Sequence, residues 1–215
     1  MSSCRIVVLI SGSGSNLQAL IDASKRGDID GRIVAVISNR PGVKGLERAT
    51  ASNIPAITID HTIYPDRASF DQALAAKIDE YAPDLVVLAG FMRILTDEFV
   101  QHYSGRMLNI HPSRLPKYQG LHTHQRALDA GDAEHGASVH FVTAELDGGP
   151  VVLQSRLAIR PEHTPDILAA ELLPQEHRIY PLVVAWFCAG RLALTSEGVT
   201  LDGRKLDTPL QLDAL

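Results

Sequence analysis

The chain has 215 residues, of which 45% are hydrophobic and 21% are charged, a composition typical of a globular protein. Its formal net charge of −5 argues against a nucleic-acid partner, because a phosphate backbone selects basic surfaces. No segment approaches the length of a membrane span, and the apolar run Ile6–Ile10 is too short for a signal peptide, so we expect a cytoplasmic protein without a membrane partner.

Strand-like and helix-like segments alternate through the first half of the chain. Strands rich in Ile, Val or Leu are predicted at Arg5–Ile10, Arg32–Ser38, Ala56–Ile59, Leu85–Ala89 and Met107–His111. Helices are predicted between them at Ser15–Arg26, Gly45–Ser52 and Asp66–Tyr81. This alternation predicts an α/β fold with a Rossmann-like, doubly wound and mostly parallel sheet.

The second half has a different pattern. Ala137–Val142 and Val151–Leu157 are predicted strands joined by a Gly-rich turn, which indicates an antiparallel hairpin and therefore an antiparallel C-terminal part of the sheet. A long helix is predicted within Thr164–Ala189, with irregularities at Pro174 and Pro181. The remaining predicted strands are Leu192–Thr195 and Val199–Asp202, which suggest a small hairpin. No linker or repeat divides the chain, so residues 1–215 are expected to form a single domain.

Two polar side chains end the strand at Met107–His111. Asn109 and His111 point to the same face, because side chains alternate along a strand. Asp147, in the Gly-rich turn, could reach the histidine and hold it protonated. Asn, His and Asp together suit a reaction in which negative charge grows on a carbonyl oxygen while a proton moves. Each residue alone also has a plain structural interpretation, as a strand-end histidine or a turn aspartate.

The loop Ser11-Gly12-Ser13-Gly14-Ser15-Asn16 follows the first strand and opens the first helix. Glycines there let the backbone approach a ligand, and the helix N-terminus offers free N–H groups, so the loop is a candidate anion cradle. The dinucleotide fingerprint fails, because Leu17 stands where a third glycine is needed. A phosphate monoester therefore fits better than NAD or ATP, and the alternative is a simple tight turn.

The other candidates are weaker. His122 and His124 have the spacing of a metal pair, but no nearby ligand completes a tetrahedral set, so a solvated loop and no metal are expected. His140 is interpreted as a hydrogen-bonded partner near the site. The segment Phe91–Leu95 either lines a slot for a flat heteroaromatic ring or packs in the core. Ligands of parallel sheets bind outside the carboxyl ends of the strands, so Ser11–Ser15, Phe91–Leu95 and His111 should converge.

Across nearly its full length the chain resembles the phosphoribosylglycinamide formyltransferase family. The matching segments are Ile6–Leu20 (IVVLISGSGSNLQAL), Asp84–Leu95 (DLVVLAGFMRIL), Met107–Pro116 (MLNIHPSRLP), Gly120–His124 (GLHTH), His135–Gly149 (HGASVHFVTAELDGG) and Gln175–Pro181 (QEHRIYP). The NIHPS and LDGGP elements are typical of formyltransferases in general. The GSGSN, GLHTH and QEH elements indicate the glycinamide ribonucleotide branch.

The resemblance implies formyl transfer from 10-formyltetrahydrofolate to the amine of N1-(5-phospho-D-ribosyl)glycinamide in de novo purine (IMP) synthesis, without a metal. It implies that Gly14, Ser15 and Asn16 hold the ribonucleotide phosphate and that Glu176 binds elsewhere on that substrate. The implied folate-binding residues are Arg67, Met92, Arg93, Ile94, Leu95, Asn109, Thr143, Ala144, Glu145, Leu146 and Asp147. The implied catalytic residues are Asn109, His111 and Asp147.

The expected mechanism is direct attack of the amine on the formyl carbon. Asn109 and a protonated His111 would stabilise the tetrahedral oxyanion, and Asp147 would support the charge on His111. Arg114 and Gln119 depart from the family pattern, in which leucine and proline are common, and they bear on loop mobility and substrate affinity.

Two other functions stay open. One is a sibling enzyme, either a 10-formyltetrahydrofolate hydrolase or an aminoacyl-tRNA formyltransferase. We expect neither, because the hydrolase usually carries an extra N-terminal domain and the tRNA enzyme an extra C-terminal one, and the acidity of the chain disfavours tRNA. The other is a non-catalytic nucleotide-sensing module. The sequence is compatible with a monomer or a homodimer.

Overall fold

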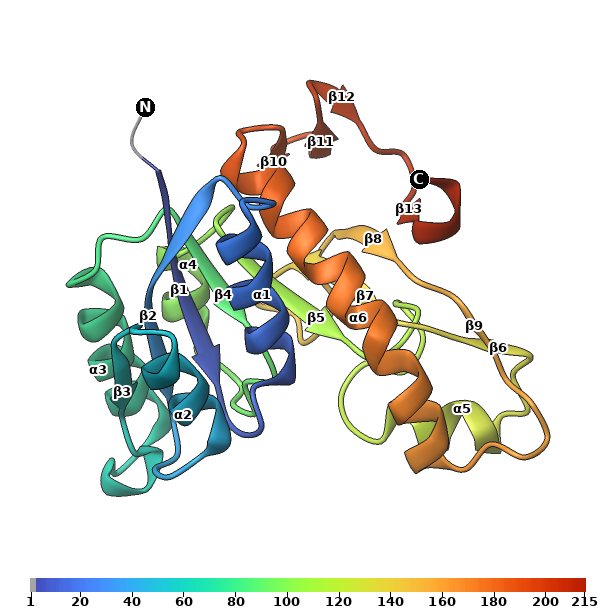
Figure 1. Ribbon diagram of the computed structural model, residues 1–215, viewed down its shortest axis with the longest axis horizontal. Helices are drawn as coiled ribbons and strands as arrows, with labels where there is room; N and C mark the ends of the chain where they lie inside the picture. Colours follow the sequence, from blue (N-terminus) through green and yellow to red (C-terminus); the bar gives the residue numbers. More distant parts are fainter. Residues whose placement is uncertain (1–2) are drawn as a thin grey trace.

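A computed structural model describes residues 3–215 as an α/β domain built around one eight-stranded sheet (Figure 1). The strand order is β13-β8-β7-β5-β4-β1-β2-β3. The five strands of the first half pair in parallel: β1 (Cys4–Ile10), β2 (Gly31–Ser38), β3 (Ala56–Thr58), β4 (Leu85–Leu88) and β5 (Met107–His111). The doubly wound, mostly parallel sheet predicted from the sequence is therefore confirmed.

Helices cover both faces of this sheet. On one face Leu17 and Leu20 belong to the same buried cluster as Ile6 and Val8 of β1. The helices of that face are α1 (Ser15–Arg26), α2 (Lys44–Ala51) and α6 (Pro165–Cys188). The opposite face of β1 packs against α3 (Arg67–Asp79) and α4 (Asp97–His102). Because side chains alternate along β1, this strand contributes to two hydrophobic cores, one on each face of the sheet.

The antiparallel part follows β5. Strand β7 (Ser138–Phe141) pairs antiparallel with β5 and with β8 (Val151–Gln154), so the expected hairpin is present. The predicted strand Val151–Leu157 is shorter than expected. At Ser155 the backbone N–H still donates to the Ala137 carbonyl, at 2.9 Å, but the Ala137 N–H donates to the Ser155 hydroxyl, at 3.1 Å, in place of a backbone carbonyl. The chain then resumes as β9 (Leu157–Ala158), which pairs with β6 (Glu134–His135).

The tail forms a small separate sheet and then returns to the main one. A hairpin joins β10 (Leu192–Thr195) to β11 (Gly198–Leu201), as predicted, and β12 (Arg204–Lys205) extends it. Strand β13 (Leu210–Gln211) adds parallel to β8. Single 3₁₀ turns lie at His61–Ile63 (η1) and Leu212–Ala214 (η2).

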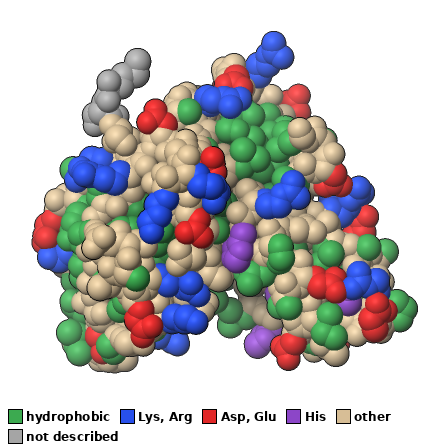
Figure 2. Space-filling model, in the orientation of Figure 1, with side chains coloured by type: hydrophobic (Ala, Val, Ile, Leu, Met, Phe, Trp, Pro, Cys, Tyr) green, Lys and Arg blue, Asp and Glu red, His purple; other side chains and the backbone are tan. Residues whose placement is uncertain are grey.

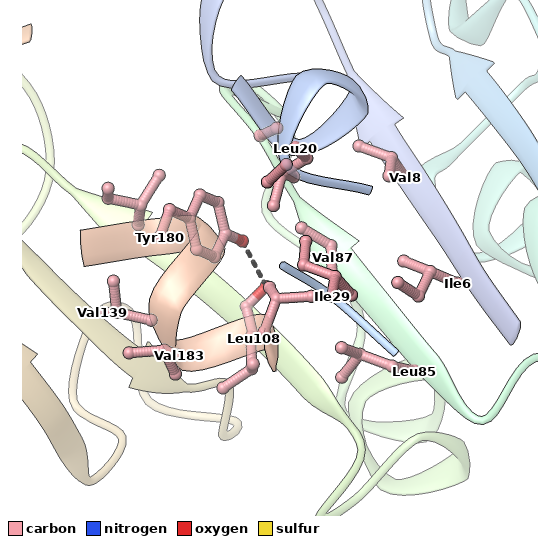
Figure 3. Close-up of a cluster of buried hydrophobic side chains, with 14 of the residues drawn as sticks. Ile6, Val8, Leu20, Ile29, Leu85, Val87, Leu108, Val139, Tyr180 and Val183 are labelled. Carbon is pink, nitrogen blue, oxygen red and sulfur yellow. Dashed lines mark hydrogen bonds between the residues drawn. The ribbon is translucent and has the colours of Figure 1, made fainter. Parts of the chain in front are cut away.

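Helix α6 packs on one face of the sheet and is hydrogen-bonded to two of its strands. It is continuous through Pro174 and Pro181, so the two prolines do not interrupt it. The buried hydroxyl of Tyr180 shares its proton between two carbonyl oxygens, those of Leu88, at 2.7 Å, and Leu108, at 3.0 Å. Figure 3 shows the bond to Leu108. The shared bond ties the helix to the last residue of β4 and to the second residue of β5.

One expected loop contains a helix. Residues Thr123–Asp129 form α5, which packs against α6 (Figure 1), so the solvated loop expected around His122 and His124 is wrong from Thr123 onward. Thr123 is buried, and His124 Nδ1 lies 3.0 Å from Nε2 of the buried His135. Contacts with distant parts of the chain, which local spacing does not reveal, stabilise this short helix.

Candidate active site

The polar segments that follow β1, β4 and β5 lie at one edge of the sheet. These strands are neighbours in the sheet and run parallel, and the Ser11 N–H donates to the Gly90 carbonyl at 3.1 Å. The expected convergence of the three segments is therefore confirmed. Figure 2 shows a notch at the lower edge of this face, between the part built by α1 and α2 and the part built by α5 and α6.

His111 and Asp147 lie together in a nearly closed environment. His111 Nδ1 is 3.4 Å from Asp147 Oδ2, and the side chains are 8% and 9% exposed. The same carboxylate oxygen accepts the Gly120 N–H at 2.9 Å. Asp147 has a positive φ of 50°, an uncommon conformation that aspartate tolerates and that the Gly-rich turn accommodates. The predicted pair is thus in place, with a loop amide as an additional partner.

Asn109 is oriented by His140. The two residues are directly opposite on β5 and β7, and Asn109 Nδ2 lies 3.1 Å from His140 Nε2. His140 Nδ1 is 2.9 Å from the Phe141 carbonyl, so this nitrogen carries the proton and Nε2 is the acceptor. Burial lowers the pKa of His140, which keeps the ring neutral. His140 Nε2 lies 3.8 Å from Asp147 Oδ1. Because the ring is neutral, this is a polar contact and not an ion pair.

The second ring nitrogen of His111 also faces an acceptor. Its Nε2 lies 2.9 Å from the Tyr118 carbonyl oxygen, while Nδ1 faces Asp147. The His111 ring therefore lies between a carboxylate on one side and a backbone carbonyl on the other.

The candidate anion cradle has the backbone that its glycines suggest. Gly14 adopts φ +70°, and a Cβ there would lie 2.7 Å from the Cα of Gly45. Helix α1 begins directly afterwards at Ser15. Arg48 closes one side, because its Nε donates to the Ser13 carbonyl at 2.8 Å. A cavity of about 320 Å³ opens here, lined by Ser15, Gln18, Ala19, Asp22, Arg26, Arg48 and His177.

Glu176 reaches the cradle from α6. Its Oε2 accepts from Asn16 Nδ2 at 2.8 Å, although the two residues are 160 positions apart. Burial raises the pKa of Glu176, and the Asn16 hydrogen bond opposes that rise. The other amide atom, Asn16 Oδ1, is buried without a protein partner among the residues that the structure describes. The pair thus brings together two predicted binding residues and leaves one unsatisfied acceptor beside the cradle.

The residues predicted to bind folate lie on two loop segments, 92–95 and 143–147, which we call the two walls, with Asn109 on β5 and Arg67 on α3. Met92, Ile94 and Leu146 are 60%, 57% and 50% exposed, which is unusual for large apolar side chains. Leu95 and Val142, which lead into the two walls, pack on the same buried cluster. Thr143, Ala144 and Glu145 continue the second wall into the Asp147 turn and are half-buried or exposed. Arg67 is exposed at the first residue of α3.

Several residues of the site have no local sequence signal. Tyr118, Gly120 and Arg48 contribute through backbone or long-range contacts. Arg114, which departs from the family pattern, donates to Glu134 at 2.8 Å and to Gln211 at 3.2 Å, linking its loop to the tail. Gln119 uses its carbonyl to accept from Arg126 at 2.6 Å. Only the positions of these partners in the folded chain identify them.

Within residues 3–215, no three His, Cys, Asp or Glu side chains are grouped so as to hold a metal ion. No helix in the same range is long and apolar enough to cross a membrane.

Comparison with known proteins gives a consistent assignment. The Formyl transferase family model matches residues 4–184. The phosphoribosylglycinamide formyltransferase of Escherichia coli (strain K12) is 55% identical over 201 residues, covering 94% of this chain and 95% of its own, and that of Haemophilus influenzae is 48% identical over 202 residues, with the same coverage. A solved phosphoribosylglycinamide formyltransferase from Coxiella burnetii, in complex with CHES, superposes with a TM-score of 0.93 at 52% identity, covering 98% of this chain and 99% of its own. The chain therefore belongs to the formyl transferase family and is a transferase.

Proposed function

We propose that the protein transfers a formyl group from 10-formyltetrahydrofolate to the amine of phosphoribosylglycinamide, in de novo purine synthesis in the cytoplasm. The observation that carries the proposal is the placement of His111, Asn109 and Asp147 at the same sheet edge as the cradle at Gly14–Asn16. One substrate brings a phosphate and the other a flat apolar ring. The edge offers a candidate anion cradle and two exposed apolar segments.

The residues at the cradle suit a phosphorylated sugar. The N-terminus of α1 supplies free N–H groups and a positive dipole end, and Arg48 adds a fixed positive charge. Glu176 is held by Asn16 beside the same loop, where its carboxyl group can accept hydrogen bonds from sugar hydroxyls. The unsatisfied Asn16 oxygen provides a further acceptor. Together these groups recognise both a phosphate and its neighbouring hydroxyls.

The apolar segments suit the folate substrate. Met92 and Ile94 expose their side chains on one segment, and Leu146 does so on the other. Burying such side chains against a ring system contributes roughly 25 cal/mol per Å² of apolar surface removed from water. We assign Arg67, Met92–Leu95 and Thr143–Asp147 to this substrate, with Arg67 near its anionic tail.

The catalytic groups would stabilise charge on the formyl oxygen. As the amine attacks the formyl carbon, negative charge develops on that oxygen. His140 occupies one Asn109 N–H and leaves the second free to donate to it. Protonated His111 supplies the other donor, and Asp147 maintains its charge. Because His111 Nε2 faces the Tyr118 carbonyl, this contact must be exchanged for the formyl oxygen during the reaction. Collapse of the tetrahedral intermediate then breaks the bond between the formyl carbon and the folate nitrogen, and the proton lost by the attacking amine passes to that leaving nitrogen through water or His111.

The assay that tests the proposal follows deformylated folate with and without phosphoribosylglycinamide. We expect release only in the presence of the acceptor. Acceptor-independent release would favour the hydrolase, and binding of both compounds without release would favour the sensing module. Glu176→Gln serves as the matched variant, and it should raise the acceptor KM while leaving the donor KM unchanged.

A further inference from the structure

We infer that Ser11 and Asp71 are positioning residues that anchor the two ends of the segment formed by residues 91–96, and so set one wall of the formyl-donor site. The inference rests on the proposed function for its substrate but on the contacts below for its geometry. Ser11 opens the loop that contains the cradle but is not among the residues assigned to the phosphate, which are Gly14, Ser15 and Asn16, and Asp71 belongs to no assigned set.

The 91–96 segment has little regular structure of its own. It contains no helix or strand, and Gly90 turns the chain into it with φ +72°. Met92 and Ile94 point outward and are more than half exposed, while Phe91 is buried. A segment that exposes large apolar side chains gains little from its own packing, so other groups must hold its backbone in place.

Ser11 anchors the first end. The Met92 N–H donates to Ser11 Oγ at 2.7 Å, and the Ser11 hydroxyl in turn donates to Asn39 Oδ1 at 2.5 Å. The direction of these two hydrogen bonds is fixed. The Met92 N–H can only donate, so the Ser11 hydroxyl accepts from it and uses its own proton to donate to Asn39. Ser11 is 5% exposed and Asn39 is 1% exposed. Two linked, buried hydrogen bonds with a fixed direction hold the Met92 amide at one position.

Asp71 anchors the other end. The Thr96 N–H donates to Asp71 Oδ2 at 2.6 Å, which joins α3 to the end of the segment. Asp71 is 2% exposed, and Thr96 is the N-cap of α4, so the same bond also fixes the start of that helix. Arg93 lies over the Phe70 ring at 5.7 Å, giving α3 a second contact with the segment. The segment is therefore held at one end by Ser11, which directly follows β1, and at the other end by Asp71 on α3.

This arrangement makes a specific kinetic prediction. Loss of either anchor frees one end of the wall without touching the groups that carry out the reaction. Losing one such hydrogen bond should raise the KM for 10-formyltetrahydrofolate roughly tenfold. A change in KM at constant kcat indicates lost uniform binding, so kcat and the acceptor KM should stay within about twofold.

The test compares Ser11→Ala and Asp71→Ala with two matched controls. Asp71→Asn keeps an oxygen acceptor for the Thr96 amide while removing the charge, and Ser104→Ala removes an exposed hydroxyl far along the chain on the α4–β5 connection. Both controls should keep the wild-type donor KM. Amide hydrogen exchange gives a readout besides activity: Ser11→Ala should speed exchange at Met92, and Asp71→Ala at Thr96.

The outcomes separate the anchors from the proposed function. An equal rise in both KM values for Ser11→Ala would place Ser11 in the anion cradle and overturn its role in the wall. Unchanged exchange at Met92 and Thr96 would overturn the anchoring itself. A wild-type enzyme that transfers no formyl group would refute the proposed function, while exchange at the two amides would still test the anchors. If Ser11→Ala does not fold, Asn39→Ala is the alternative, because it removes the acceptor of the Ser11 hydroxyl. This variant must also speed exchange at Met92.

Discussion

Asn109 and His140 are joined across two antiparallel strands by a hydrogen bond of 3.1 Å between Nδ2 and Nε2. The His140 ring is itself fixed by the Phe141 carbonyl, which accepts a hydrogen bond from Nδ1–H. The order of these contacts sets which way the Asn109 amide faces and leaves one of its N–H groups available for substrate. We therefore propose that His140 orients Asn109 and takes no part in proton transfer.

Replacing His140 should separate this orienting role from a packing role. His140→Leu removes the acceptor for Asn109 and should lower kcat by roughly 10- to 100-fold, because an oxyanion donor works only when it is preorganised. In His140→Gln the side-chain oxygen can take the place of Nε2 as acceptor, and much of the rate should return. Steady-state kinetics with thermal unfolding as the control distinguishes the two roles. Equal kcat values for the Leu variant and the wild type would contradict the assignment.

His111 and Asp147 should behave as a unit. His111→Asn should lower kcat by roughly 10²- to 10⁴-fold while the protein stays folded, because it removes the charged donor. Asp147→Asn keeps an acceptor for the Gly120 N–H but loses the negative charge beside Nδ1. If Asp147 acts only through His111, the double variant should be no slower than His111→Asn alone. Additive losses in this double-mutant cycle would show that Asp147 has an independent role.

Local sequence patterns were enough to predict the parallel sheet and helices α1, α2 and α3, but not the six-residue helix α4. Strands β1, β2, β4 and β5 are largely apolar and buried, and the glycines after β1 mark the turn into α1. Short elements were not predictable in this way. Strand β13 has two residues and exists only because β8 offers an edge, and α5 depends on packing against α6.

Some residues of the site could also be predicted from local sequence, and others could not. Asn109 and His111 share a strand, so their common face follows from the sequence. The contact between Asn16 and Glu176 joins residues 160 positions apart, and only the resemblance to a family predicted both as substrate-binding. Ser11 and Asp71 had no such signal, because a serine in a Gly-rich loop and an aspartate on a helix are common without any role in a site.

The two neighbouring glycines of the cradle provide a sharply matched test. Gly14 has φ +70° and lies against the backbone of Gly45, whereas a Cβ on Gly12 would meet nothing within 4 Å. Gly14→Ala should cost about 1–3 kcal/mol of unfolding free energy and raise the acceptor KM, because the loop must shift. Gly12→Ala should change both quantities little. Chemical denaturation and steady-state kinetics measure the two effects. A Gly14→Ala variant with wild-type affinity for the acceptor would show that this loop does not hold the phosphate.

Acid should destabilise the protein partly through His135. This residue is 1% exposed and contacts His124 at 3.0 Å, and burial followed by the charges of neighbouring histidines lowers its pKa to about 4. Below the unfolded-state pKa of about 6.5 the unfolded chain takes up a proton that the folded state resists. The stability contributed by the neutral ring is therefore present above pH 6.5 and is lost as the pH falls toward 4. Its full size over that window is on the order of 3 kcal/mol.

Comparison with His135→Gln isolates this contribution from other titrating groups. Burial raises the pKa of Glu176, so this group acts in the opposite sense and gains stability as the pH falls toward the unfolded-state pKa of glutamic acid. Glu176 is present in both proteins, so its contribution cancels in the difference between their unfolding free energies. Urea unfolding at several pH values between 7.5 and 4.5 should show that the variant is less stable than the wild type at neutral pH and that the gap narrows in acid. A gap that stays constant with pH would mean that His135 is protonated equally in the folded and unfolded states.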